Sequence, residues 1–190
     1  MDAGFSFAVR YVPRNFVVTD DSAQGNLTTP EAEDILGAGL ALMVVQHVAA
    51  SPWTPSGSLG QSYGQYAVAN ARAIGLPAGI SLFLDLEGVA AGTSAETVSD
   101  YCGSWYDVVA AAGYVPGIYI GANCGLGASQ IEALPFRYFW ESGSKVPAIA
   151  PGYCMKQSIS SSYVLAGVAY DLDVIQADAN GNTPFWLKAD

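Results

Sequence analysis

In two apolar, strand-like runs of the 190-residue sequence, two carboxylates are separated by a single residue. Asp85 and Glu87 lie in the run SLFLDLE, and Asp171 and Asp173 lie in YDLDV. Because side chains alternate along a β-strand, both members of each pair share one face. Repulsion and desolvation raise the pKa of one member, which leaves an acid beside a charge-stabilising carboxylate. Glycoside hydrolysis uses that combination, and an ion pair or capping contact at a strand end is the structural alternative.

Further polar and aromatic residues interrupt the other apolar runs and could complete a pocket. If their faces converge, the pocket is acidic and also holds one guanidinium group, two amides and two aromatic rings. Aromatic faces beside amide and carboxylate groups suit a sugar. The residues that we expect to bind this sugar are Arg10, Gln46, Tyr119, Trp140, Gln157 and Asp173.

Several of these residues also have a structural interpretation. For Arg10, an ion pair with one of the inward acids is favoured over direct contact with a ligand. Tyr119 and Trp140 could instead pack in the core. His47 follows Gln46 directly, so we predict that it faces away from the pocket as a packed histidine.

The sequence gives little support to other site chemistries. His47 is the single histidine, which excludes a His-rich metal site. Cys102, Cys124 and Cys154 have no CxxC spacing, so we expect small buried cysteines, with a Cys124–Cys154 disulfide as the alternative. Phosphate-binding glycine motifs and the Gly-x-Ser-x-Gly elbow are both missing from the sequence. We therefore predict neither a metal ion nor an organic cofactor.

The elements that must position these residues alternate between short apolar runs and Ala-rich stretches. Strands are predicted at 5–12, 40–48, 79–87, 115–121, 136–141, 152–157 and 170–175. Helices are predicted after Thr28, over 60–74, from a Thr93-x-x-Glu96 capping box to Ala112, and over 129–134.

Seven strands separated mostly by helices favour parallel βαβ units. Two α/β architectures fit this order, a (β/α) TIM-barrel-like fold and an open doubly wound sheet. Polar groups gather at the carboxyl ends of several strands, which favours the barrel. No linker interrupts the chain, so we predict one domain over 1–190.

Composition limits the partners. With 7 Lys and Arg against 17 Asp and Glu, the formal charge is −10, which disfavours nucleic acid and anionic membrane surfaces. The apolar runs 35–45 and 108–122 fall short of the ~20 residues that a membrane span needs. The first residues lack the features of a signal peptide, which leaves open a cytoplasmic location, another export route or a start further upstream.

Four segments carry a family resemblance: GFSFAVRY, LTTPEA leading to AGL, FLDLE, and PGIY. In this order they resemble the bacterial glycoside hydrolase-like domains of uncertain function, which are related to the family 25 lysozymes. The resemblance implies a TIM-barrel-like fold that acts on, or binds, the β-1,4-linked glycan of peptidoglycan. It implies that Glu87 is the general acid, that Asp85 stabilises positive charge, and that Asp171 is the aspartate of the last strand.

The sequence departs from that family at one point. Relatives begin with a strand that ends in Gly-x-Asp, whereas this sequence starts within the second strand, so we expect seven strands. Either the chain is truncated, or its start is mis-assigned, or this version has lost part of the site. We therefore keep two main hypotheses, a muramidase-like glycosidase and a non-catalytic domain that binds cell-wall glycan. A phage-encoded or secreted structural module is a third.

Overall fold

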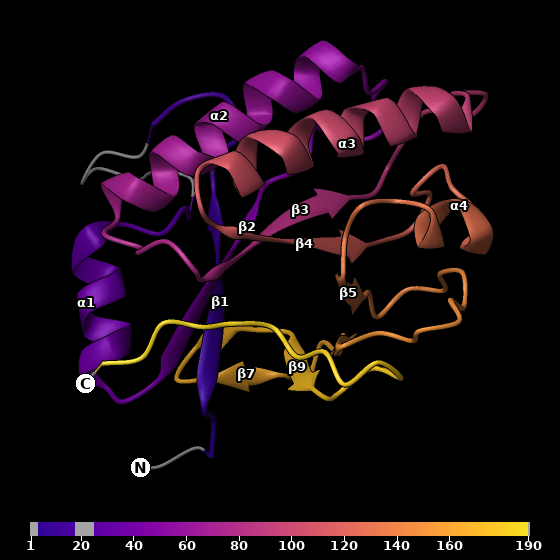
Figure 1. The fold of residues 1–190 in the computed structure, drawn as a ribbon. Coiled ribbons are helices and arrows are strands. Elements are labelled where there is room, and N and C mark those ends of the chain that lie inside the picture. The colour runs from indigo at the N-terminus through magenta and orange to yellow at the C-terminus, as the bar shows by residue number, and fades with distance from the viewer. Residues whose placement is uncertain (1–3, 18–24, 190) are drawn as a thin grey trace.

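The computed structural model describes residues 4–17 and 25–189. A curled, seven-stranded sheet with the strand order β1-β2-β3-β4-β5-β6-β9 forms half of a barrel (Figure 1). The bounds of its strands are β1 Phe7–Val12, β2 Ala41–Gln46, β3 Ser81–Leu86, β4 Val115–Ile120, β5 Tyr138–Glu141, β6 Met155–Ser158 and β9 Leu172–Ile175. The mixed α/β class is confirmed, and the arrangement is consistent with a TIM-barrel-like fold.

The helices connect the strands and cover one face of the sheet. They are α1 (Thr29–Gly37), α2 (Gly57–Ala73), α3 (Ala95–Ala111) and the short α4 (Ala128–Glu132). Figure 1 shows α2 and α3 lying together over the sheet. Thr28 caps α1 as expected, but the cap of α3 is Ser94, whose hydroxyl accepts a hydrogen bond from the Thr97 N–H. Thr93 instead donates its hydroxyl proton to the Ala90 carbonyl, so the predicted capping box was one residue early.

Strand alternation divides the core into two clusters. Leucines 82, 84 and 86 of β3 face the helices, as predicted. The other face carries an inner cluster formed by Met43, Val45, Phe83, Tyr119, Trp140 and Met155. The concave side of the curled sheet therefore has its own small apolar core. Because successive side chains of a strand point to opposite faces, each polar residue of a strand lies either on this concave side or on the helix side.

The last part of the chain differs from the predicted pattern. β9 runs antiparallel to β6, and a hairpin of β7 (Val164–Leu165) and β8 (Val168–Ala169) precedes it. Parallel strands need a crossover, usually a helix, and the segment after β6 forms this hairpin instead. The chain therefore returns to β6 in the opposite direction. In the described part of the chain, β1 and β9 remain as the two edges of the sheet.

The C-terminal segment closes the amino ends of the strands. The Ser81 N–H donates to the Phe185 carbonyl, and Leu42 and Leu187 exchange two backbone hydrogen bonds. Trp186 packs against the inner cluster. In Figure 1 this segment is the yellow trace that crosses β1 in the view and ends at the C mark beside α1. The accessible end of the half-barrel is consequently the carboxyl end of the strands.

Two further expectations have clear outcomes. Cys102, Cys124 and Cys154 are all free and buried, so the alternative of a Cys124–Cys154 disulfide was wrong. Within the described residues, no helix combines the length and the apolar character that crossing a bilayer requires.

Candidate functional site

The carboxylate pair of the third strand faces the concave side of the sheet. Asp85 is the fifth residue of β3, on the face opposite the three leucines, and Glu87 follows the end of the strand on the same face. Gly121, just after β4, lies against Glu87, because a Cβ built at this glycine would overlap the Glu87 carboxylate. The glycine therefore provides the space in which the Glu87 side chain lies.

Burial determines how this pair ionises. Asp85 is only 3% exposed, and its Oδ1 is buried without a hydrogen-bond partner among the described residues. Burial and the nearby Glu87 raise the pKa of Asp85 well above its ordinary value, against a backbone hydrogen bond from Val48 that lowers it. Burial also raises the pKa of the half-buried Glu87. Both groups therefore hold their protons more tightly than exposed carboxyl groups do.

The second pair is held in place by three predicted site residues. Trp140 donates its Nε1–H to Asp173 Oδ1 at 2.9 Å. Gln157 donates to Asp171 Oδ2 at 3.1 Å, and its Oε1 accepts from the Tyr119 hydroxyl at 2.8 Å. Burial and the charge of Asp171 raise the pKa of Asp173 to about 7, although the hydrogen bond from Trp140 acts in the opposite direction.

Tyr119 and Trp140 pack in the inner cluster and also form hydrogen bonds to polar residues of the site. Both are less than 10% exposed and belong to the inner cluster, where their rings meet edge to face at 4.7 Å between centroids. Their polar atoms nevertheless bond Gln157 and Asp173. They orient the polar residues and offer little ring surface to a sugar.

Tyr11 is a further residue of the site that was not predicted from the sequence. Burial raises the pKa of its hydroxyl, and the charges of all four carboxyl groups, Asp85, Glu87, Asp171 and Asp173, raise it further. We call these four groups the carboxyl cluster. Tyr11 is 37% exposed as a residue, and its ring stacks on the His47 imidazole, with 4.1 Å between centroids and 5° between planes.

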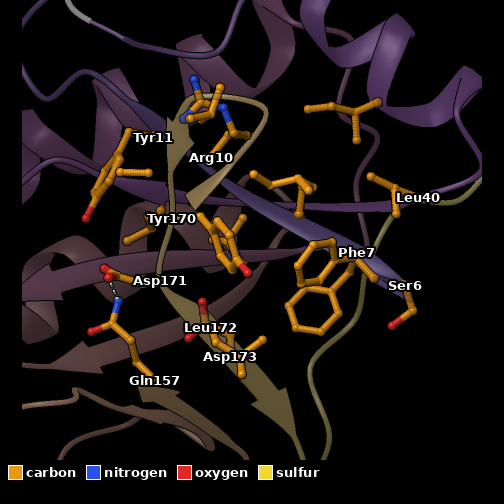
Figure 2. Close-up of a pocket in the computed structure, with 18 of the residues that line it drawn as sticks. Ser6, Phe7, Arg10, Tyr11, Leu40, Gln157, Tyr170, Asp171, Leu172 and Asp173 are labelled. Carbon is orange, nitrogen blue, oxygen red and sulfur yellow. Dashed lines mark hydrogen bonds between the residues drawn. The ribbon is translucent and has the colours of Figure 1, made fainter. Parts of the chain in front are cut away.

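An open hollow of about 960 Å³ lies beside the carboxyl cluster. Its walls come from β1, the β7–β8 hairpin and β9, so we call it the β1–β9 hollow. Figure 2 shows Tyr11, Gln157, Asp171 and Asp173 around it. Asp85 and Glu87 do not line the hollow. Phe5 and Tyr170 meet edge to face at 5.2 Å and connect the two sides of the gap between the sheet edges.

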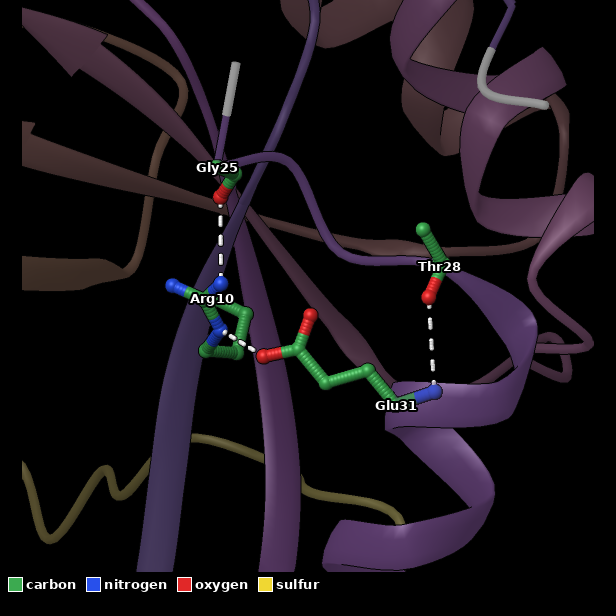
Figure 3. Close-up of polar contacts among 4 residues, drawn as sticks. All are labelled: Arg10, Gly25, Thr28 and Glu31. Carbon is green, nitrogen blue, oxygen red and sulfur yellow. Dashed lines mark hydrogen bonds and ion pairs between the residues drawn. The ribbon is translucent and has the colours of Figure 1, made fainter. Parts of the chain in front are cut away.

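Arg10 does not pair with the inward acids. It lies on β1 at the rim of the β1–β9 hollow, and its Nε–H donates to Glu31 Oε1 of α1 at 2.6 Å (Figure 3). A second guanidinium nitrogen donates to the Gly25 carbonyl at 3.0 Å. Arg10 does form an ion pair, as expected, but with Glu31 and not with an inward acid. Because side chains alternate along β1, Arg10 points to the side opposite Tyr11, toward α1.

Gln46 is also on the helix side of the sheet. Its amide donates to the Tyr63 carbonyl at 2.7 Å and accepts from Trp105 Nε1 at 2.8 Å. The prediction that Gln46 lines the pocket and that His47 faces away was therefore wrong. Along β2, Gln46 points toward the helices, and the next residue, His47, points toward the concave side, where it stacks on Tyr11. Both faces of β2 are apolar, so alternation alone gave no signal of which face is inward. The signal that could have placed His47 on the concave side was Tyr11 of the neighbouring strand β1, on which its ring stacks.

A second depression of about 680 Å³ lies at the loops that follow β3, β4 and β5. Its lining includes Thr93, Gly121, Asn123 and Lys145. It lies at the carboxyl end of the strands, where barrel enzymes have their substrate-binding loops. Among residues 4–17 and 25–189, no three His, Cys, Asp or Glu side chains are arranged to hold a metal ion.

Residues 1–164 match the family described as "Rv2525c-like, glycoside hydrolase-like domain". This match ends before β9, so Asp171 and Asp173 lie outside it. No curated protein matches the chain significantly.

Solved structures show the same fold. The Tat-secreted protein Rv2525c of Mycobacterium tuberculosis in complex with L-tartrate has a TM-score of 0.64 at 20% identity, over 88% of this chain and 83% of that one. The same protein in complex with HEPES has a TM-score of 0.64 at 21% identity, over 92% and 86% of the chains. An uncharacterized B. stearothermophilus protein has a TM-score of 0.61 at 18% identity, over 89% and 96%.

Proposed function

Since this chain belongs to the Rv2525c-like, glycoside hydrolase-like domain family, we propose that it acts on a cell-wall glycan, namely peptidoglycan, as a muramidase-like glycosidase. The observation that carries this proposal is that Asp171, Asp173 and Tyr11 line the β1–β9 hollow, and that the charges of Asp85 and Glu87 also act on the Tyr11 hydroxyl. Carboxyl groups in different environments supply the acid and the charge stabiliser that cleavage of a glycosidic bond needs.

Glu87 is the proposed general acid. Its burial raises the pKa of its carboxyl group, so that more of the acid stays protonated near neutral pH. The proton would pass to the glycosidic oxygen as the bond to the sugar carbon breaks. Asp85, one residue away on the same face of β3, would stabilise the oxocarbenium-like state in its ionised form, and Asp171 would support it from the loop before β9.

The sugar itself would be bound mainly by residues on the wall of the hollow. Gln157, Asp171 and Asp173 offer hydrogen-bonding groups there, and the exposed ring of Tyr11 offers an aromatic face. Tyr119 and Trp140 act as positioning residues, because their polar atoms hold Gln157 and Asp173.

A non-catalytic domain that binds cell-wall glycan is the second candidate. One observation favours it: Asp85 is almost fully buried, and its pKa is raised well above the ordinary value. Such a group holds its proton more tightly than an exposed aspartate, and a protonated carboxyl group would bind a sugar without stabilising an oxocarbenium ion.

Peptidoglycan turnover by the wild-type protein and by Glu87→Gln separates the two candidates. The glycosidase proposal expects release of reducing ends by the wild type and a loss of about 100-fold or more when the proton donor is removed. Glu96→Gln is the matched control, because Glu96 is exposed in the first turn of α3. Binding to peptidoglycan without reducing-end release, unchanged in Glu87→Gln, would reject the glycosidase and support the binding domain.

A further inference from the structure

Among the described residues, no lysine or arginine pairs with the carboxyl cluster. The sequence has 7 Lys and Arg, all at described positions: Arg10, Arg14, Arg72, Arg137, Lys145, Lys156 and Lys188. The ion pairs among the described residues are Arg10–Glu31 and Lys156–Glu141, and neither involves the cluster. No lysine or arginine contributes to the pKa shifts of Asp85, Glu87 or Asp173.

Asp85 supplies an independent indication that a partner is absent. Its side chain lies on the concave face of β3, it is 3% exposed, and its buried Oδ1 has no hydrogen-bond partner within the described residues. A buried oxygen without a partner costs free energy, so such an atom in a folded protein calls for an explanation, such as a bound water or ion, strain or a role in catalysis. A hydrogen-bond donor that reaches the concave face of β3, beside the β1–β9 hollow, would satisfy it.

The arrangement of the cluster suits an organic cation. The four carboxyl groups are spread from β3 to the region of β9, and no three acidic, histidine or cysteine side chains in the described ranges are grouped to hold one metal ion. The β1–β9 hollow is open, and the half-exposed ring of Tyr11 lines it. An ammonium group can make charge-assisted hydrogen bonds to carboxylates and can also lie against an aromatic face.

On these grounds we propose that the β1–β9 hollow selects glycans whose hexosamine units carry free, protonated amino groups over the same glycans in fully N-acetylated form. This inference rests on the proposed glycan function and specifies its substrate class. An N-acetyl group is neutral and leaves the carboxyl cluster without a counter-charge, whereas the ammonium group of a de-N-acetylated unit supplies one.

The protonation of the cluster fits the same proposal. Without a cation, burial raises the pKa values of Asp85, Glu87 and Asp173. A neighbouring carboxyl charge raises those of Asp85 and Asp173 further, that of Asp173 to about 7. A bound ammonium group would lower these pKa values again. Binding of an amino sugar near neutral pH should therefore release protons to the buffer, and binding of an N-acetylated sugar should release fewer.

Calorimetry with two tetrasaccharides tests the proposal at neutral pH and low ionic strength. The probes are the β-1,4-linked tetramer of glucosamine and the corresponding tetramer of N-acetylglucosamine. We expect the glucosamine tetramer to bind about tenfold more tightly or better, and this preference to shrink when salt is added. Asp171→Asn, at an exposed position, should reduce the preference several-fold, whereas Asp107→Asn on the exposed face of α3 should leave it unchanged.

The possible results distinguish failure of the amino-sugar preference from failure of the proposed glycan function. Equal or tighter binding of the N-acetylated tetramer would overturn this inference and leave the proposed glycan function standing. Failure of both tetramers and of peptidoglycan to bind would overturn both. Spermidine has amino groups but no sugar ring, and binding of spermidine as tight as that of the glucosamine tetramer would show that charge alone is recognised, which would also overturn the inference.

Discussion

Asp173 is the residue through which the site responds most directly to solution pH. Burial and the charge of Asp171 raise its pKa from an ordinary 3.8 to about 7. The folded state therefore holds this proton more tightly than the unfolded state. Its contribution to stability is fully present below about pH 4 and is lost as the pH rises toward 7.

We expect this loss to be measurable as a slope in the free energy of unfolding. In the window between about pH 4 and 7, a single group of this kind contributes at most about 1.4 kcal/mol for each pH unit. Asp173→Asn should make the profile flatter by a large part of that slope, and Asp107→Asn serves as the control for loss of one carboxylate. Urea denaturation across this pH range measures the slope, and parallel profiles for wild type and Asp173→Asn would contradict the assignment.

The residues of the site were only partly predictable, because spacing defines which residues share a face but not which face is concave. For β3 the leucines marked the helix side, so Asp85 and Glu87 were placed on the correct face. For β2 both faces are apolar, and Gln46 was assigned to the wrong one. Tyr11 was missed because it looked like one more apolar residue of its strand.

At the scale of elements, the packing of α2 against α3 depends on glycine. A Cβ built at Gly60 would overlap the backbone carbonyl of Tyr101, and one at Gly64 would lie 3.0 Å from Val108 Cβ. The overlapped carbonyl belongs to the helix backbone and cannot rotate away. The two helices that cover the sheet can therefore approach this closely only while position 60 has no side chain.

Gly60→Ala should consequently destabilise the protein by about 1–3 kcal/mol, even though alanine is the better helix former. Gly103→Ala is the matched control in the neighbouring helix, because a Cβ at Gly103 meets no atom within 4 Å. There we expect a gain of about 0.5–1 kcal/mol from helix propensity alone. Thermal unfolding of both variants measures the contrast, and equal shifts of Tm would show that the helices can separate without cost.

Most elements were predictable from turn residues and periodicity, and the exceptions have a local cause. The helices have recognisable caps and glycine stops, and every predicted strand of the main sheet exists. The direction of β9 was not predictable, because no sequence signal separates a crossover from the hairpin of residues 164–169. That hairpin is exposed and carries apolar side chains, so its composition resembles that of a buried strand.

At the scale of the whole molecule, the half-barrel is held together by contacts that do not belong to its sheet. β1 and β9 do not pair with each other among the described residues, but Phe5 and Tyr170 connect the segments that precede them. The inner cluster receives Phe7 and Val9 from one edge strand and Ile175 from the other. Trp186 of the C-terminal segment packs on the same cluster, at the end remote from the carboxyl cluster.

Trp186 should therefore contribute to the stability of the entire fold. Trp186→Ala removes a half-buried indole from the inner cluster, and we expect a loss of about 2 kcal/mol, below the about 3–5 kcal/mol of a fully buried tryptophan. Phe185→Ala is the matched control, because Phe185 is 49% exposed and makes one edge-to-face contact with Tyr138. Its loss should stay below about 1 kcal/mol.

Urea unfolding followed by fluorescence and by circular dichroism measures the free energy of unfolding of both variants. If Trp186→Ala costs no more than Phe185→Ala, the C-terminal segment only covers the strand ends, and the sheet must hold its curvature without it.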